Sequence, residues 1–428
     1  MNFNSKRLSK QLLPVCCLFL LCQPVLAAPV ELTLADSLAL ALASHANIKV
    51  AESNREKAYW AVSQAKASKG VAANISHTDR HYSVPVAIDN RYSNNQFDTE
   101  LVLSYPLYSG GKLENQLEQT RLDLTVAELT LTAARQQLRQ DVTTYYFNVL
   151  QYQKEWQVSQ ETVDNLTAHL QHVSAQYQIG TVAKSDVLAS QVELANARDT
   201  LIQAQNNRQL AAAKLNNAVG LPLDSEVVLK EELSYAPYPL TLDDCVQYAV
   251  THRPEIAEYQ AKVASAEAAV KIAGSGKLPT VDVTLAQAWD DRTFPGLDNS
   301  NWQIGLTASL NIFDSGVNKA KIKQSKYDVA TAQQEARLQR ETILLEVREA
   351  YLSIGEAEKR IDIKQVAVAQ AEESLTIAEA RYRAGLGTNL AVFDAVVALN
   401  QAKMNSIKAL YDYNTGKARL DKAMGITA

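Results

Sequence analysis

The chain contains few of the residues that interrupt helices and few that form crosslinks. Its 428 residues include only 15 Gly and 11 Pro, and aromatic residues make up 7%. Such a composition favours helices. Three of the four cysteines (Cys16, Cys17 and Cys22) lie close to the N-terminus, so Cys245 is the only one in the rest of the chain. A disulfide within that larger part is therefore excluded.

Strong charge and long apolar runs are also missing. The formal net charge is −5, and a mildly acidic protein is a poor candidate for binding nucleic acid. Beyond the N-terminus, no run of 18 apolar residues predicts a transmembrane helix. Because the N-terminal residues predict export, the protein is either free outside the cytoplasm or crosses a membrane as β-structure.

The first 28 residues differ from the remainder. Lys6, Arg7 and Lys10 form a basic start, residues 12–21 are mostly apolar, and small residues surround Ala27. This pattern predicts a secretory signal peptide over residues 1–28. A retained membrane anchor is the alternative, but the apolar stretch is short for a stable span.

Catalytic and ligand-binding motifs are scarce. The run Ser109-Gly-Gly-Lys112 lacks the spacing of a phosphate-binding loop. His169 and His172 lie three positions apart, but no third metal ligand has matching spacing, so a solvated helix face is the favoured interpretation. The sequence predicts no enzyme activity, no cofactor and no metal site.

The chain repeats itself. Leu32-Thr-Leu34 begins one half, and Leu240-Thr-Leu242 begins the other. From Tyr108 and Phe313 onward, equivalent residues keep a constant offset of 205 positions. We therefore divide the chain into a first repeat (29–220), a Pro-containing linker (221–239) and a second repeat (240–428).

Each repeat has the same predicted order: a helical stretch (33–69 or 241–274), a strand pair (within 71–109 or 278–315), a very long helix, a Gly-containing turn and a shorter helix. Alternating apolar residues predict strands over 97–107, 281–289 and 302–313, with a weaker partner at 73–81. Polar loops are expected at 85–95 and 290–301. Both long helices show a heptad-like apolar seam, which is typical of coiled-coil packing. The first spans residues 112–178, or roughly 100 Å at 1.5 Å per residue.

Two glycines, Gly180 and Gly385, end the long helical patterns and predict the tips of two helical hairpins. Aromatic residues near the strand ends suggest a membrane-interface belt, with strand packing as the alternative; they are Tyr105, Tyr108, Trp289, Trp302 and Phe313. Four strands cannot close a barrel, and an open edge in lipid is costly, so several chains would have to share one barrel.

The sequence resembles the TolC-like outer-membrane efflux protein family across essentially its whole length after residue 28. The resemblance is carried by the duplicated Leu-Thr-Leu starts, by residues 108–111 and 313–316 between strand and helix, and by the two tips at 176–187 and 381–394. It implies a mainly α fold with a small β part. In this family a homotrimer forms a twelve-stranded outer-membrane barrel, four strands per chain, that continues into a periplasmic α-helical barrel.

The resemblance also implies a function and its residues. Such a protein is an exit duct, in efflux or type I secretion, that joins a periplasmic adaptor and an inner-membrane pump. Tyr382 matches a gating tyrosine, Asp186 its acidic partner, and Asp394 one of two acids that ring the constriction. Ala391 replaces the other ring acid, and Gly387 replaces a basic residue of the closed state. The adaptor would dock on the tip residues, which are Gly180, Thr181, Val182, Ala183, Gly385, Leu386 and Gly387.

A second class of protein is also compatible with these patterns. A periplasmic coiled-coil adaptor or scaffold that never enters a membrane also presents a helical hairpin with a turn at its end. Such adaptors usually carry one hairpin beside small β-domains, whereas this chain has two hairpins and two strand pairs. The duct in the outer membrane, with contact to lipid, is therefore the preferred prediction.

Overall fold

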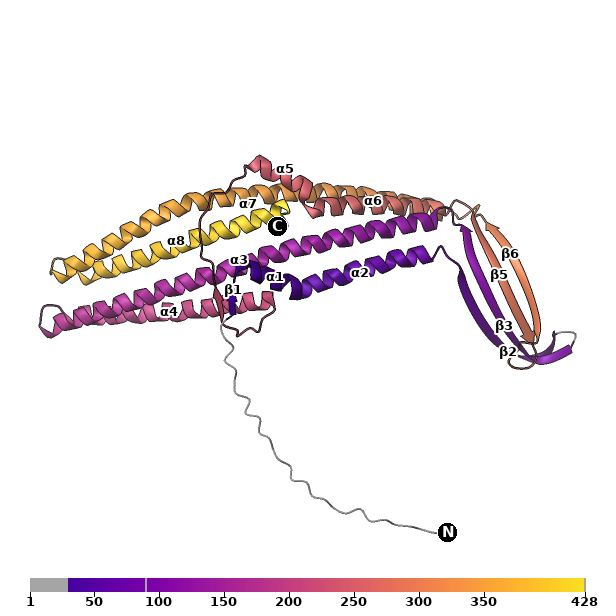
Figure 1. Cartoon of the computed structure of the whole chain (residues 1–428), viewed down its shortest axis with the longest axis horizontal. Helices are drawn as coiled ribbons and strands as arrows, with labels where there is room; N and C mark the ends of the chain where they lie inside the picture. The colour runs from indigo at the N-terminus through magenta and orange to yellow at the C-terminus, as the bar shows by residue number, and fades with distance from the viewer. Residues whose placement is uncertain (1–29, 89–90, 427–428) are drawn as a thin grey trace, which may run out of the picture.

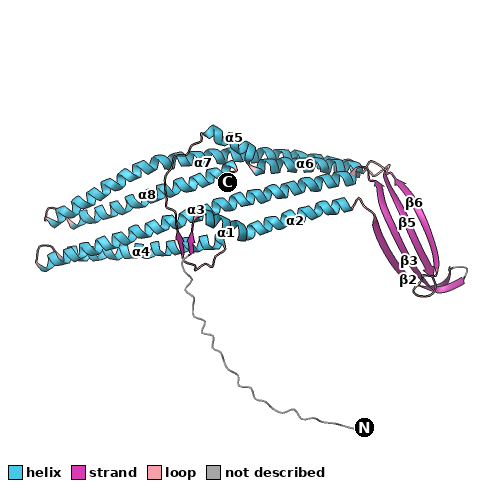
Figure 2. Cartoon of the chain, viewed as in Figure 1, coloured by secondary structure: helices cyan, strands magenta, loops and turns pink. Residues whose placement is uncertain are grey.

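The computed structural model describes residues 30–88 and 91–426, so the predicted signal peptide lies outside the described part. The described chain is elongated, with a four-stranded sheet at one end and helical hairpins at the other (Figure 1). Helices account for most of the length, and the sheet is the main β element (Figure 2). This is the mainly α fold with a small β part that the sequence predicts.

Both halves contain the same helices at the same lengths. The first half comprises β1 (Val30–Leu32), α1 (Leu34–Ser44), α2 (Ala46–Ala67), β2 (Ala72–Ile88), β3 (Arg91–Tyr108), α3 (Lys112–Gln178) and α4 (Lys184–Val219). The second comprises β4 (Val227–Leu229), α5 (Leu242–His252), α6 (Pro254–Ser275), β5 (Thr280–Asp291), β6 (Asn299–Ser309), α7 (Val317–Arg383) and α8 (Asn389–Met424). Helices α3 and α7 have 67 residues each, and α4 and α8 have 36 each. The predicted long helix over 112–178 is confirmed, as is the duplication.

The helical stretches expected at 33–69 and 241–274 are confirmed, and each consists of two helices separated by a break. His45 and Arg253 have extended backbones, with ψ of 130° and 119°, between the paired helices. In the second repeat Pro254 follows at the first helical position, where its missing N–H costs nothing. The break lets α1 and α5 turn away and pack beside the long helices.

The sheet joins the two repeats side by side. Its strand order is β2-β3-β5-β6, all antiparallel, so the central pair β3–β5 connects one repeat to the other. Strand β6 ends at Ser309 rather than at Phe313, and β5 and β6 extend into the expected loop at 290–301, which is correspondingly shorter. The outermost strands β2 and β6 each have one edge without a strand partner in the described chain.

The polar loop expected at 85–95 is wrong, because β2 continues to Ile88 and β3 begins at Arg91. Polar cross-strand contacts hold this part of the hairpin: Arg80 pairs with Asp98, and the Tyr82 hydroxyl donates to Gln96 at 2.9 Å. Pro85 lies within a register irregularity between His81 and Val86. An irregular position suits proline, which has no N–H for the ladder.

The long helices pack through the seams that their apolar residues predict. In α3, the seam residues Leu138 and Val142 are buried in a cluster with α1, α2 and α4. Ile343 and Val347 of α7 occupy a matching cluster with α5 and α8. The segment expected as a linker contributes β4, which pairs in parallel with β1. No helix in the described residues is long and apolar enough to cross a membrane.

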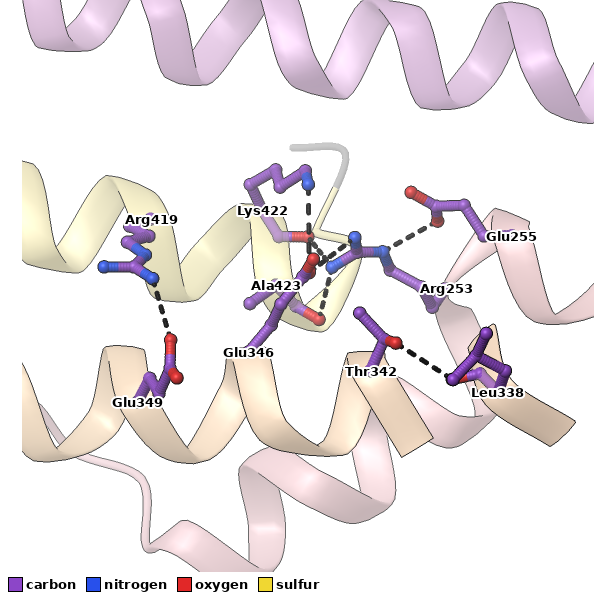
Figure 3. A network of polar contacts seen from close by, with 9 residues as sticks. All are labelled: Arg253, Glu255, Leu338, Thr342, Glu346, Glu349, Arg419, Lys422 and Ala423. Atoms are coloured by element: carbon purple, nitrogen blue, oxygen red, sulfur yellow. Dashed lines mark hydrogen bonds and ion pairs between the residues drawn. The ribbon is translucent and has the colours of Figure 1, made fainter. Parts of the chain in front are cut away.

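A buried arginine closes the C-terminal end of α8 (Figure 3). The Arg253 side chain is 1% exposed, and its Nη1 donates to the carbonyl oxygens of Lys422 (3.1 Å) and Ala423 (2.9 Å). The remaining guanidinium nitrogens pair with Glu255 (2.7 Å) and Glu346 (2.9 Å). The last carbonyls of a helix have no partner within the helix, so this arginine satisfies groups that would otherwise be buried and unpaired.

Candidate gate and docking tips

Each hairpin turns through the same motif at its tip. Gly180 has a φ of 78° and Gly385 a φ of 73°, values that glycine adopts without strain. The following amides, of Thr181 and Leu386, donate back to Gln176 (3.0 Å) and Arg381 (2.8 Å). These bonds define a Schellman motif, which ends a helix and satisfies its last carbonyls. The helix reversals predicted from the two glycines are therefore confirmed.

The predicted docking residues differ in accessibility. Leu386 is 73% exposed, and a Cβ on Gly180 would meet no other atom within 4 Å among the described residues. Val182 is half-buried against the apolar cluster at the tips, so it faces inward. A Cβ on Gly387 would lie 3.1 Å from the backbone nitrogen of Tyr382, so glycine there lets the turn lie close to the helix end.

Tyr382, the predicted gating tyrosine, is buried between the two hairpins. Its side chain is 5% exposed, and its hydroxyl has no hydrogen-bond partner among the described residues. Burial raises the pKa of this hydroxyl, and the nearby Asp186 carboxylate raises it further. The structure thus brings Asp186 and Tyr382 near each other, but no hydrogen bond joins their side chains within the described chain.

Histidine packs against this tyrosine. The His169 ring lies 5.2 Å from the Tyr382 ring and 5.6 Å from the Phe393 ring, centroid to centroid. His172 lies 6.5 Å from the same tyrosine. The prediction of a solvated helix face for His169 is therefore wrong. The spacing of the two histidines along α3 could not show that residues of the second hairpin pack against them.

A shallow groove of about 300 Å³ near the tips is lined by residues of α3 and α7. Its polar lining includes an ion pair between Glu379 and Arg383 at 3.2 Å, as well as His169 and His172. Within residues 30–88 and 91–426, no three His, Cys, Asp or Glu side chains are grouped so that they could hold a metal ion.

Asn389 is a site residue that the sequence analysis missed. It begins α8, is 6% exposed, and bonds to α3 and α4 of the other hairpin. Its amide nitrogen donates to the backbone oxygen of Asp186 at 3.0 Å. No local pattern distinguishes an asparagine at a helix start from an ordinary one, so only the packing of the hairpins identifies it.

Asp394 lies apart from these residues. It is exposed on α8, on a face that also carries the exposed side chains of Leu390 and Val397. Ala391, in the position of the missing ring acid, is exposed as well. The structure therefore brings Asp186, Tyr382 and Asn389 together and leaves Asp394 outside their cluster.

The five predicted interface aromatics form two groups along the sheet. Tyr105, Tyr108 and Phe313 lie at the end next to the long helices, whereas Trp289 and Trp302 lie toward the far end. Tyr108 pairs with Val281, and Trp289 is eight residues further along β5. At 3.3 Å per residue, the outermost members, Tyr108 and Trp289, are about 26 Å apart along the sheet, whereas Tyr105 and Trp302, level with Val283 and Gln287, are about 13 Å apart.

A family model described as "Outer membrane efflux protein" matches residues 37–221 and 245–426. The outer membrane protein TolC of Escherichia coli is 22% identical over 399 residues, covering 89% of this chain and 80% of that protein. The cobalt-zinc-cadmium resistance protein CzcC of Cupriavidus metallidurans is 24% identical over 401 residues, covering 92% and 90%.

Solved structures share the fold. The crystal structure of the Campylobacter jejuni CmeC outer membrane channel superposes with a TM-score of 0.83 at 18% identity, covering 92% of this chain and 85% of that one.

Proposed function

The chain belongs to the outer membrane efflux protein family, and from this premise we propose that it forms an exit duct across the outer membrane and periplasm. One observation carries the proposal. Two 67-residue helices, each about 100 Å long, run from the four-stranded sheet to the two hairpin tips. A compact globular protein has no need of such length, whereas a duct that reaches across a compartment does.

We propose that the duct is a homotrimer inserted through its sheet. The free edges of β2 and β6 would pair between neighbouring chains, so three copies would supply twelve strands with no open edge. The outermost aromatics of the two groups, Tyr108 and Trp289, are about 26 Å apart, which is close to the height of an apolar band about 25 Å tall between two interfaces. Trp289 and Trp302 would lie at the outer interface, and Tyr105, Tyr108 and Phe313 at the inner one.

Membrane extraction and conductance together test the duct. We expect the protein to stay in the membrane fraction after a carbonate wash and to form ion channels in a planar bilayer. A protein that washes off and does not conduct would be a periplasmic adaptor or scaffold instead. Cargo passes through the duct without a catalytic step, and the partner pump determines which cargo is exported.

The gate, in this proposal, lies at the tips. Asp186 and Tyr382 lie near each other where the two hairpins of a chain meet, and Asp394 would contribute one carboxylate per chain to a ring at the constriction. A ring of carboxylates favours cations. We expect Asp186→Ala to raise conductance and Asp394→Asn to reduce the preference for cations without changing trimer stability. Unchanged ion selectivity in Asp394→Asn would exclude the ring.

The adaptor of an inner-membrane pump would dock on the exposed turns at residues 180–183 and 385–387. Leu386 offers the sharpest test, because it is exposed and needs no special backbone conformation. We expect Leu386→Asp to stop adaptor-dependent export while bilayer conductance stays normal, and Leu386→Met to export normally. Equal export by both variants would place the docking surface elsewhere.

A further inference from the structure

Asn389 connects three helices through one buried side chain. Its Oδ1 lies 2.7 Å from His169 Nε2 of α3. Its Nδ2 donates to the Asp186 backbone oxygen at 3.0 Å and to Ser190 Oγ at 3.2 Å, both on α4. We call these four residues, His169, Asp186, Ser190 and Asn389, the Asn389 cluster. Every contact of Asn389 in it crosses from the second hairpin to the first.

The direction of each hydrogen bond in the Asn389 cluster is fixed. A backbone carbonyl can only accept, so the atom of Asn389 that faces Asp186 must be the amide nitrogen. The opposite atom is then the amide oxygen, and His169 must present a protonated Nε2 to it. Ser190 Oγ accepts from Asn389 and donates its own proton to the Asp186 oxygen at 2.8 Å.

The surroundings of the Asn389 cluster are apolar. Val163 and Leu166 of α3, Leu194 of α4, and Val392 and Val396 of α8 are all buried in the same cluster of side chains. Apolar contacts are not directional, so they discriminate weakly between similar arrangements of the two tips, whereas a buried polar group left without its partner is costly. The Asn389 cluster therefore selects one relative position of the two tips from among those that the apolar contacts allow.

The first repeat lacks an equivalent. Position 184 corresponds to position 389, and Lys184 is exposed. A hydrogen-bond network from α8 to α3 and α4 thus connects the two tips in each chain. The network provides a polar connection at the tips of a chain in which Gly387 and Ala391 replace two charged residues of the family.

We propose that Asn389 is a positioning residue of the gate, which fastens the second tip to the first and favours the closed arrangement of the duct. The proposal rests on the proposed duct function. Opening requires the tips to separate, and separation breaks all three contacts of Asn389. Removing the Asn389 side chain beyond Cβ should therefore shift the equilibrium toward the open duct.

Single-channel recording tests this directly. Asn389→Ala should raise the ratio of open to closed time about tenfold, which corresponds to about 1.4 kcal/mol. The matched control is Asn405→Ala, because Asn405 is also on α8 but the hydrogen bond that its Oδ1 accepts from Gln401 at 3.1 Å stays within the helix. The control should conduct as the wild type does. Equal open times in both variants would overturn the proposal.

Variants of His169 separate a polar role from simple packing. His169→Gln keeps an N–H donor for Asn389, so it should remain close to the wild type. His169→Leu fills similar space without a donor, so it should open as readily as Asn389→Ala. Wild-type gating in His169→Leu would show that packing alone holds the tips. Trimer content on gels, measured for every variant, shows which ones still assemble.

A reversible crosslink provides an independent measurement. The side chains of Ser190 and Asn389 approach to 3.2 Å, and the free cysteine Cys245 is fully buried. In Ser190→Cys/Asn389→Cys, oxidation should join the tips and stop export, and reduction should restore it. Full export by the oxidised protein would show that the tips need not separate.

The two proposals can fail separately. If the wild-type protein forms no channel, the proposed function is wrong. If the wild type conducts but Asn389→Ala and His169→Leu gate as it does, only the role of Asn389 is wrong.

Discussion

The two repeats have helices of equal length, but they close the ends of their last helices by different means. Helix α4 ends at Gly220, where the single hydroxyl proton of Ser44 is shared between the Leu40 oxygen at 2.8 Å and the Val219 oxygen at 3.2 Å. Helix α8 ends at Gly425, where Arg253 contacts two carbonyls and two carboxylates. A duplicated backbone can therefore keep its geometry while one copy uses a neutral hydroxyl and the other a buried charge.

This difference has consequences for the free energy of unfolding. A buried ion pair is sensitive to loss of one partner, because the remaining charge stays in a poorly solvated place. A neutral hydrogen bond contributes about 1 kcal/mol net. The second repeat should thus be the more fragile of the two toward substitution at its helix end.

The largest expected effect is that of Arg253→Ala. It removes the donor to Lys422 and Ala423 and leaves Glu255 and Glu346 without their cation, so we expect a loss of about 3 kcal/mol in the free energy of unfolding. Thermal unfolding followed by circular dichroism in detergent measures this loss.

The matched substitution in the first repeat is Ser44→Ala, for which we expect a loss of about 1 kcal/mol. Equal losses in Arg253→Ala and Ser44→Ala would show that the two repeats are closed with the same strength.

Next in size is Gly425→Ala. The residue has a φ of 84°, and a Cβ there would lie 2.9 Å from the His252 oxygen and 3.0 Å from Arg253 Cα. Both atoms belong to backbone that cannot rotate away, so we expect a loss of about 2 kcal/mol in unfolding free energy.

Gly180→Ala is the matched control for Gly425→Ala, because Gly180 has a similar φ but a Cβ there would meet no other atom within 4 Å among the described residues. There we expect only the cost of the left-handed conformation, about 1 kcal/mol. Chemical denaturation of both variants compares the two. Equal denaturation midpoints for the two variants would mean that the backbone of His252 and Arg253, close to Gly425, adds no steric cost to the alanine side chain.

The smallest expected effect is a gain in the free energy of unfolding, from Asp421→Asn. Burial raises the pKa of Asp421, and the charge of Lys417 only partly opposes it. The equivalent residue in the first repeat is Asn216, which is fully buried and donates to two carbonyl oxygens. Asp421→Asn makes the second repeat like the first, and we expect it to raise the free energy of unfolding at pH 7.

The sign of the pH dependence follows from this shift. A carboxyl whose pKa is higher in the folded state binds its proton more tightly there, so its contribution to stability improves as pH falls. The advantage of Asp421→Asn should therefore shrink on acidification through the folded pKa. Unfolding midpoints at neutral and acidic pH measure the difference, and an advantage that grew with acid would contradict the assignment.

Features that depend on a long periodic pattern could be predicted from the sequence. Helix α3 has the expected bounds because its seam repeats over many turns and Gly180 ends it. Strand β2 was predicted only weakly and too short, because its stability comes from polar pairs such as Arg80 with Asp98 rather than from an apolar face. Alternation carries no signal where both faces are polar.

Features that depend on a distant partner could not be predicted. Arg253 interrupts a helical stretch, and it contacts carbonyls some 170 positions away. Asn389 and His169 are 220 positions apart and have no pattern in common. Each is a polar residue whose role is set by the packing of two hairpins, and hairpin packing is tertiary information.

The length of α3 makes it a lever. Tyr146 lies in the buried cluster near the middle of the helix, and the tip is 32 residues further on, or about 48 Å. A rotation of about 5° at the middle would move the tip by about 4 Å, which is more than the length of a hydrogen bond. A hydrogen bond at the tip lies farthest from the pivot, so it opposes rotation of the hairpin about the middle of α3 with the greatest torque. A few contacts at the tip can thus resist a motion that much larger surfaces near the pivot would resist poorly.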